Sequence, residues 1–255
     1  MSPRRILAVA RYTLLEALRA RLLTAILVAT LTALGLIVVI AQISVGADKR
    51  VMTDLGASAV QLIAIVQAFA TGISLVFKEY ERRTLFPLLA TPLGRAEYLV
   101  GKFFGLLLTS LCTVALSSGL YFAACALFGA VRPSMFLFPL PLMMEIAVLT
   151  AAVLFFSAFA TPAMTAVFSI GLFLLGRSVW GVETLTQYAG PWAQRFVAGC
   201  EMIIPALQAF NFTEPLLHGA KVPAGDWLFA VGYGTLWCAV LLAAAALLFE
   251  RREIV

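Results

Sequence analysis

Glu145 is the residue whose type and position in this sequence most directly suggest chemistry. It lies in a long apolar stretch at about 136–160, where an ionisable side chain costs roughly several kcal/mol and often has a function. Arg177, near the end of the next apolar stretch, is a candidate partner for the Glu145 carboxylate. Gln61 and Gln67 lie in a third apolar stretch. These amides either line a path for a substrate or hydrogen-bond between helices, and the second role is the more common.

The depth of Glu145 depends on where its helix begins. A helix that starts at Phe136 places Glu145 about 13 Å along the axis, because each residue adds about 1.5 Å. A helix that starts after Pro141 leaves Glu145 near the end of the span, at the interface. The sequence is compatible with both.

Other patterns that carry chemistry are missing. The sequence has no G-x-x-x-x-G-K-[ST] phosphate loop, so it cannot hold ATP by that route. It has no HExxH or GxSxG pattern, no Cys pair with CxxC spacing, and His218 as its one histidine. We therefore predict no catalytic residue, no metal site and no cofactor site in this chain. The spacing of Gly101 and Gly105 matches GxxxG, which is a weak signal for helix packing.

A charged segment at 78–97 surrounds a short apolar core of Leu85, Phe86, Leu88 and Leu89. A lone short helix cannot bury such a core, so the core favours docking into a groove of a partner protein. The alternative is a charged connector that lies on anionic lipid headgroups.

The composition excludes most soluble classes. Of the 255 residues, 62% are hydrophobic and 12% charged, and the mean hydropathy is +1.00. An average soluble domain is about half apolar and a quarter charged. A soluble enzyme, a disordered chain and a secreted disulfide scaffold are therefore excluded, and a helical membrane protein remains. The net charge of +5 is explained by membrane orientation; nucleic-acid binding would need a basic soluble module with aromatic platforms, and none is visible.

Six apolar stretches are long enough to span a membrane. They run at about 22–43, 55–77, 98–128, 136–160, 163–180 and 227–249. Only Thr161-Pro162 divides the fourth from the fifth, so one broken helix is the alternative there. With six spans, twelve of the 18 Lys and Arg residues fall on one side and six on the other. The positive-inside rule then places both termini in the cytoplasm.

Two further segments complete a single membrane domain over 1–255. The pattern of residues 1–21 indicates an amphipathic elbow helix that lies in the headgroup plane. The alternative is that this segment extends the first span into the cytoplasm. Its faces are Leu7, Ala10, Leu14 and Leu18 on one side, and Arg5, Tyr12, Glu16 and Arg19 on the other. The outer loop at 181–226 predicts short helices that rest on the membrane or plug the outer mouth; the alternative is a docking surface for an external partner. The fold class is therefore all-α, with six transmembrane helices after an interfacial elbow helix.

The segment at 78–97 resembles the cytosolic coupling segment of ABC-2-type transporter permeases. The family pattern has glutamates at the end of span two, then Thr-Leu, Leu-Leu, Ser/Thr-Pro, Arg, Glu-Tyr and Gly-Lys. The matching residues are Glu79, Glu81, Thr84-Leu85, Leu88-Leu89, Thr91-Pro92, Arg95, Glu97-Tyr98 and Gly101-Lys102. Arg83 stands where Gly is frequent in the family, and Gly94 where Ser is common. The long outer loop is similar to that of permeases of the nitrous-oxide-reductase maturation and gliding-motility type.

The resemblance implies a permease subunit in the bacterial inner membrane that is not itself an enzyme. It would pair with a second copy, as a homodimer, and with two copies of a separate ATPase that binds ATP and Mg. Residues 84–91 would seat in a groove of that ATPase, with a charged rim formed by Glu79, Glu81, Arg82 and Arg83. ATP-driven closure would then drive export, or transmit force to a periplasmic partner, while lipids surround the spans.

Two other classes are compatible with the residues. One is a scaffold that anchors a membrane complex without transport. The other is an integral-membrane enzyme that modifies lipid, which needs a convergent acid, base or metal set; one Glu and no His in the spans make that set poor. No residue indicates the substrate.

Overall fold

The computed structural model describes residues 3–19, 22–44, 46–81, 95–186 and 204–251, together with Trp192 and Gly199. Every regular element in these ranges is a helix, which confirms the all-α class. The elements are α1 (Pro3–Arg19), α2 (Leu22–Ile43), α3 (Asp48–Glu81), α5 (Arg95–Leu127), η1 (Pro133–Leu137), α6 (Pro139–Ser157), α7 (Pro162–Thr186), η2 (Leu207–Phe210), α9 (Thr213–His218) and α10 (Ala224–Arg251).

Five of the described helices are long and apolar enough to cross a membrane: α2, α3, α5, α6 together with η1, and α10. In α7 the apolar segment among the described side chains, Pro162–Ser178, is shorter, and the side chains of residues 179–186 are not described. The sixth span therefore stays a prediction. The division between the fourth and fifth stretches is clear, because α6 ends at Ser157 and α7 begins at Pro162.

The chain folds back between α6 and α7 rather than continuing as one broken helix. The rings of Phe156 on α6 and Phe168 on α7 pack with centroids 5.6 Å apart. Phe159, in the connection, packs against Phe155 and Phe156 at centroid distances of 5.4 and 6.0 Å. These contacts across the turn define a helical hairpin and exclude the broken-helix alternative.

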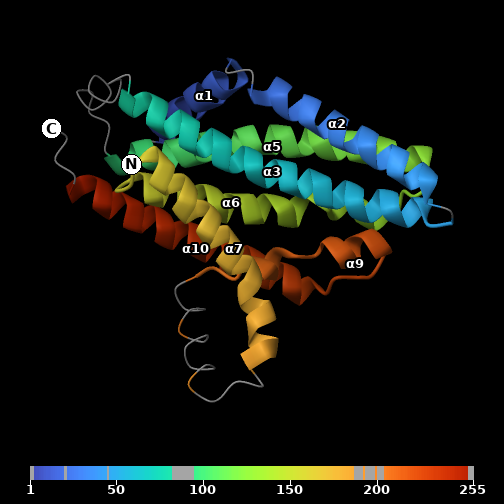
Figure 1. Cartoon of the computed structure of the whole chain (residues 1–255). Helices are drawn as coiled ribbons and strands as arrows, with labels where there is room; N and C mark the ends of the chain where they lie inside the picture. Colours follow the sequence, from blue (N-terminus) through green and yellow to red (C-terminus); the bar gives the residue numbers. More distant parts are fainter. Residues whose placement is uncertain are drawn as a thin grey trace.

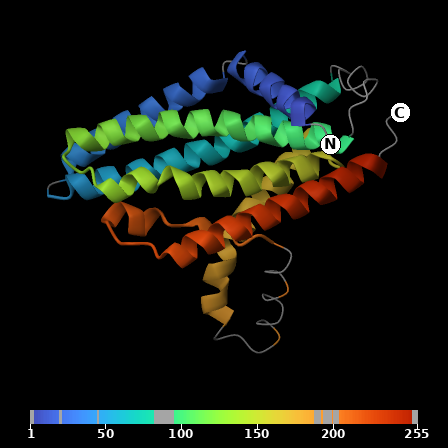
Figure 2. The ribbon, with the colours of Figure 1, turned by 180° about the vertical axis from the view of Figure 1, so that it is seen from behind.

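The helix α6 forms the centre of the bundle. Its residues 148–154 are all buried, and a helix that is apolar on every side belongs in an interior. The helices α2, α3, α5, α6 and α10 run along one common direction, whereas α7 leaves the bundle at an angle (Figures 1 and 2). The outward faces of α2 and α10 are apolar and exposed, as expected for helices in contact with lipid.

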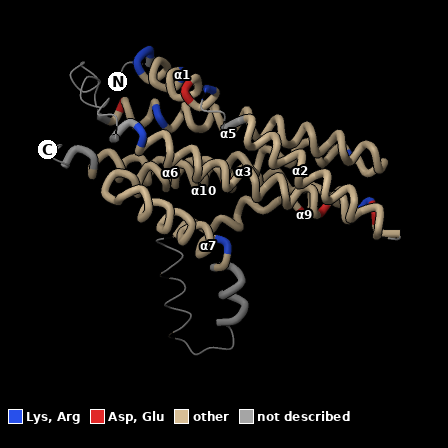
Figure 3. Tube along the Cα trace, turned by 45° about the horizontal axis from the view of Figure 1, so that its top comes forward, with Lys and Arg blue, Asp and Glu red and all other residues tan. Residues whose placement is uncertain are grey.

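The bundle has two distinct ends. Both termini, the end of α3 and the start of α5 lie at one end, which we call the terminal end (Figure 1). The α2–α3 turn, which contains Gly46, and the α5–η1 turn, which contains Gly129, lie at the other, which we call the far end (Figure 2). Both glycines have positive φ, 79° and 59°, which tight turns require. In the described residues, charged residues lie mainly near the two ends (Figure 3).

The predicted short helices of the outer loop are present where the structure describes it. The two elements are η2 and α9, and both rest on the bundle, since Leu207, Phe210, Leu216 and Leu217 are buried. The backbone approaches α7 so closely that a Cβ on Gly176 would lie 2.5 Å from the Pro205 carbonyl oxygen. Residues 187–191, 193–198 and 200–203 of the same loop lie outside the described residues.

Candidate functional site

Most of the predicted coupling residues lie outside the described part of the chain. These are Arg82, Arg83, Thr84, Leu85, Leu88, Leu89, Thr91 and Pro92. The backbones of Glu79 and Glu81 belong to the last turn of α3, and that of Arg95 begins α5, but their side chains are likewise not described. Glu97 is described, and it is buried in the first turn of α5. The structure therefore shows the contacts that fix the end of α3 and the start of α5, which flank residues 82–94, rather than the segment itself.

The first of these contacts is the packing of α1 against α5, which fixes the start of α5. The face of α1 that contains Ala10, Thr13 and Ala17 is buried. A Cβ added to Gly101 would lie 2.7 Å from the Val9 Cβ, and one added to Gly105 would lie 2.5 Å from the Thr13 Cβ. Only glycine permits so close an approach of two helices. The weak GxxxG signal thus marks a specific contact, and its partner is α1.

The face of α1 that packs shares Ala10 with the apolar face that the helical wheel predicts, but it does not contain the leucines of that face. Leu7 and Leu18 are 68% and 44% exposed, whereas Ala10 and Ala17 are buried. Small residues make the contact because they allow the helix axes to approach, and the leucines remain on an adjacent, uncovered face. Residues 20–21, between α1 and α2, lie outside the described residues. The separation of α1 from the first span and its position in the headgroup plane therefore stay predictions.

Ion pairs join α1 to both helices that flank residues 82–94. Arg5 Nη1 lies 3.8 Å from Glu97 Oε2 on α5, and Lys78 Nζ on α3 lies 3.4 Å from Glu16 Oε1. Arg5 contacts Glu97, and eight residues later Thr13 contacts Gly105, eight residues after Glu97. The two helices α1 and α5 therefore run in the same direction. The cationic partners Arg5 and Lys78 are 45% and 37% exposed. A solvent-screened ion pair contributes only about 0–1 kcal/mol, so these pairs set position more than stability.

A buried lysine adds a direct connection between α3 and α5. Lys102 is 1% exposed, and its Nζ donates a hydrogen bond of 3.2 Å to the backbone carbonyl of Leu75. A buried ammonium group is costly unless it is hydrogen-bonded, so this contact fixes the two helices relative to each other. The five residues Arg5, Glu16, Lys78, Glu97 and Lys102 form what we call the helix-end clasp. Sequence reasoning missed it, although ionisable residues inside apolar helices were the available signal.

The second polar feature surrounds Glu145. Arg177 Nη1 on α7 lies 2.7 Å from Glu145 Oε1, and Gln61 Nε2 on α3 donates to Glu145 Oε2 at 3.0 Å. Glu145 is 1% exposed. Because α6 begins at Pro139, between the two predicted starts, Glu145 lies about 9 Å along the axis. The predicted proximity of Glu145 and Arg177 is confirmed, and three helices meet at one carboxylate.

Gln67 belongs to a different contact. Its Oε1 accepts a hydrogen bond of 2.7 Å from Thr113 Oγ1 on α5, so it connects α3 to α5 and does not join Glu145. A hydrogen bond of 3.2 Å between Thr30 and Ser117 connects α2 to α5 in the same way. Both are contacts between helices, and a role in a path for substrate stays a prediction. No group of three or more His, Cys, Asp or Glu that could hold a metal ion occurs within the described residues.

A family model described as ABC-2 family transporter protein matches residues 14–254, which is nearly the whole chain. The comparison with curated proteins found no match. The matched region includes α2 to α10 and the segment at 82–94 that the helix-end clasp flanks.

Proposed function

The chain belongs to the ABC-2 transporter family, and we propose that it couples ATP hydrolysis in a separate ATPase subunit to export across the membrane. Membership in the family makes it a transmembrane permease component of an ABC transporter. The direction of transport, the contact with the ATPase and the number of copies are our proposals. An alternative use of the same coupling is transmission of force to a periplasmic partner, without passage of a substrate through the chain.

The observation that carries the proposal is the helix-end clasp. It binds α1, α3 and α5 together where α3 ends and α5 begins, and residues 82–94 connect those two ends. A force applied to this segment would therefore move three helices as one body. A connector that merely lay on lipid headgroups would not need such an arrangement.

The proposed partners follow from this arrangement. The segment at 84–91 would seat in a groove of the ATPase, with Glu79, Glu81, Arg82 and Arg83 at the rim of the contact. ATP and Mg would be bound by the ATPase, because this sequence has no phosphate loop. Two copies of the chain and two ATPase subunits would make the complete transporter. The excess of Lys and Arg at the terminal end supports a cytoplasmic position for it and for both termini, in a bacterial inner membrane.

The first test is affinity purification from the native host in mild detergent, followed by mass spectrometry. We expect a soluble ATPase with a phosphate loop, at a stoichiometric ratio to the chain. A scaffold without transport predicts other partners and no ATPase. If no ATPase is recovered, even after addition of ATP and vanadate, the coupling proposal is wrong and the scaffold is preferred.

A pair of charge reversals tests the docking segment itself. Glu79→Lys with Glu81→Lys should abolish recovery of the ATPase and its stimulation by the permease. Glu214→Lys is the control for each single reversal, Glu79→Lys or Glu81→Lys, because it makes the same change of charge at an exposed position on α9. Equal loss in the control would assign the effect to net charge rather than to the docking segment.

A further inference from the structure

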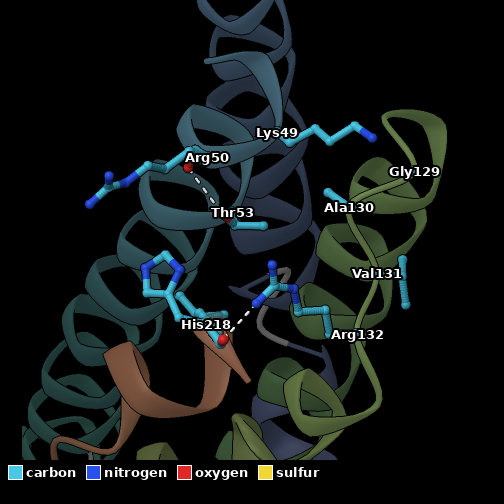
Figure 4. A pocket seen from close by; sticks show the side chains of 9 residues that line it. Lys49, Arg50, Thr53, Gly129, Ala130, Val131, Arg132 and His218 are labelled. Carbon is cyan, nitrogen blue, oxygen red and sulfur yellow. Dashed lines mark hydrogen bonds between the residues drawn. The ribbon is translucent and has the colours of Figure 1, made fainter. Parts of the chain in front are cut away.

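The far end of the bundle holds a cavity of about 510 Å³ that lies away from the helix-end clasp and the Glu145 cluster. Its walls come from the first turn of α3, the turn between α5 and η1, and the end of α9 (Figure 4). Clefts of about 300–1,000 Å³ are typical of small-molecule sites. The cavity is therefore large enough for a ligand of several heavy atoms or for a lipid headgroup.

Basic side chains from all three walls gather around this cavity. Lys49 and Arg50 come from α3, Arg132 precedes η1, and His218 ends α9 (Figure 4). Asp54, the acidic residue one turn further along α3, does not line the cavity. Three cations and one imidazole around one hollow produce a positive local field, which favours an anion.

Two of the cations that line the hollow have no described carboxylate partner. Asp54 Oδ2 lies 3.5 Å from Arg50 Nε, and Asp54 Oδ1 lies 3.2 Å from His218 Nε2. No described carboxylate pairs with Lys49 or with Arg132. Asp54 therefore offsets the charge of Arg50, and Lys49 and Arg132 keep an uncompensated positive charge.

The backbone holds Arg132 in position, and Lys49 lies beside the α5–η1 turn. Arg132 Nη1 donates to the carbonyl oxygen of His218, and Gly219, at φ +80°, leaves only 3.4 Å between its own Cβ position and that guanidinium nitrogen. The Cβ position of Gly129, at φ +59°, lies 3.9 Å from Lys49 Nζ. The positive end of the α3 dipole lies at the same place, because α3 begins at Asp48.

We propose that this cavity binds a phosphate-type oxyanion, held by Lys49 and Arg132, which is either a soluble ion or the headgroup of an anionic lipid. The guanidinium group suits a tetrahedral oxyanion because it donates along two parallel directions, and the ammonium group adds a point charge. The bound group would connect α3, the α5–η1 turn and α9 at the far end. This site does not depend on an ATPase, so the two proposals stand or fall separately.

The test uses the full chain in nanodiscs of phosphatidylcholine, titrated calorimetrically with inorganic phosphate and with pyrophosphate at low salt. A second arm uses nanodiscs that also contain phosphatidylglycerol, with native mass spectrometry of the lipid that stays bound after release into detergent. Binding of phosphate or pyrophosphate in the first arm supports a soluble ligand. Selective retention of phosphatidylglycerol in the second supports a lipid headgroup.

The variants decide whether the cavity is responsible. Lys49→Gln with Arg132→Gln should weaken binding by at least about tenfold, since two charge-assisted contacts are lost. Both side chains are exposed, so the fold should survive, and an unchanged thermal unfolding midpoint confirms that. Lys221→Gln removes a charge from an exposed position outside the cavity and should leave binding unchanged. No binding in either arm, or equal weakening by Lys221→Gln, overturns the proposal.

Discussion

Glu145 on α6 and Arg177 on α7 form an ion pair whose closest atoms are 2.7 Å apart. The carboxylate is 1% exposed and the arginine side chain 29% exposed, so the arginine reaches inward from the edge of the bundle. With Gln61 from α3 as a second donor, the pair attaches α7 to the central helix. Because α7 leaves the bundle at an angle (Figure 1), this attachment fixes where α7 departs.

The ion pair yields the first prediction. Arg177→Gln should lower the free energy of unfolding by about 2 kcal/mol, because it leaves a buried carboxylate without its cation; the loss is below the 3–5 kcal/mol of fully buried pairs because Arg177 is part-exposed. Thermal unfolding in detergent measures the change. Adding Glu145→Gln to this variant should recover much of the loss. A double variant less stable than Arg177→Gln alone would contradict the pairing.

The glycine contact between α1 and α5 yields the second prediction. Gly105→Val should destabilise the chain by about 1–3 kcal/mol, because the new side chain overlaps Thr13 and must push α1 away. It should also lower ATPase stimulation. Gly119→Val is the control in the same helix, since nothing lies within 4 Å of its Cβ position. Equal effects at both positions would indicate a general loss of helix propensity, and not a lost contact.

The helix-end clasp yields the third prediction, which separates coupling from stability. Glu16→Lys should change the unfolding free energy by no more than about 1 kcal/mol, because the pair with Lys78 is part-exposed. ATPase stimulation should fall clearly, since α1 and α3 then repel. The exchanged pair, Glu16→Lys with Lys78→Glu, should restore stimulation. If the exchanged pair does not restore ATPase stimulation, the ion pair between Glu16 and Lys78 has no part in coupling.

A buried hydroxyl at the far end yields the fourth prediction. Tyr121 is fully buried, and its hydroxyl donates to the Thr53 carbonyl oxygen at 2.9 Å. Tyr121→Phe should cost about 1 kcal/mol, because the carbonyl loses that donor in an apolar setting. Tyr12→Phe, at a side chain that is 60% exposed, should cost much less. The two unfolding midpoints, compared in the same detergent, test the difference.

The sequence by itself determined the membrane class, the helices and the family. The predicted span at 22–43 coincides with α2, Leu22–Ile43, because a run of apolar residues without Pro or charge can satisfy its backbone in lipid only as a helix. Glu145 was recognisable for a similarly local reason, as a charge within an apolar run. The resemblance at 78–97 also needed only the order of residues, and the family that it indicated is confirmed by the family match. The coupling role of these residues stays a prediction.

Only the tertiary structure decided which helices touch. It shows that Gly101 and Gly105 of α5 pack against α1. It also shows that Gln67 and Gln61 hydrogen-bond to different helices, and that Lys49 and Arg132 line the same cavity. The reason is that helices in lipid are apolar on several sides, so hydrophobic periodicity does not identify the buried face. The buried face is determined by close helix approach at small residues and by hydrogen bonds between positions distant in sequence. Both depend on partner residues that no local sequence pattern specifies.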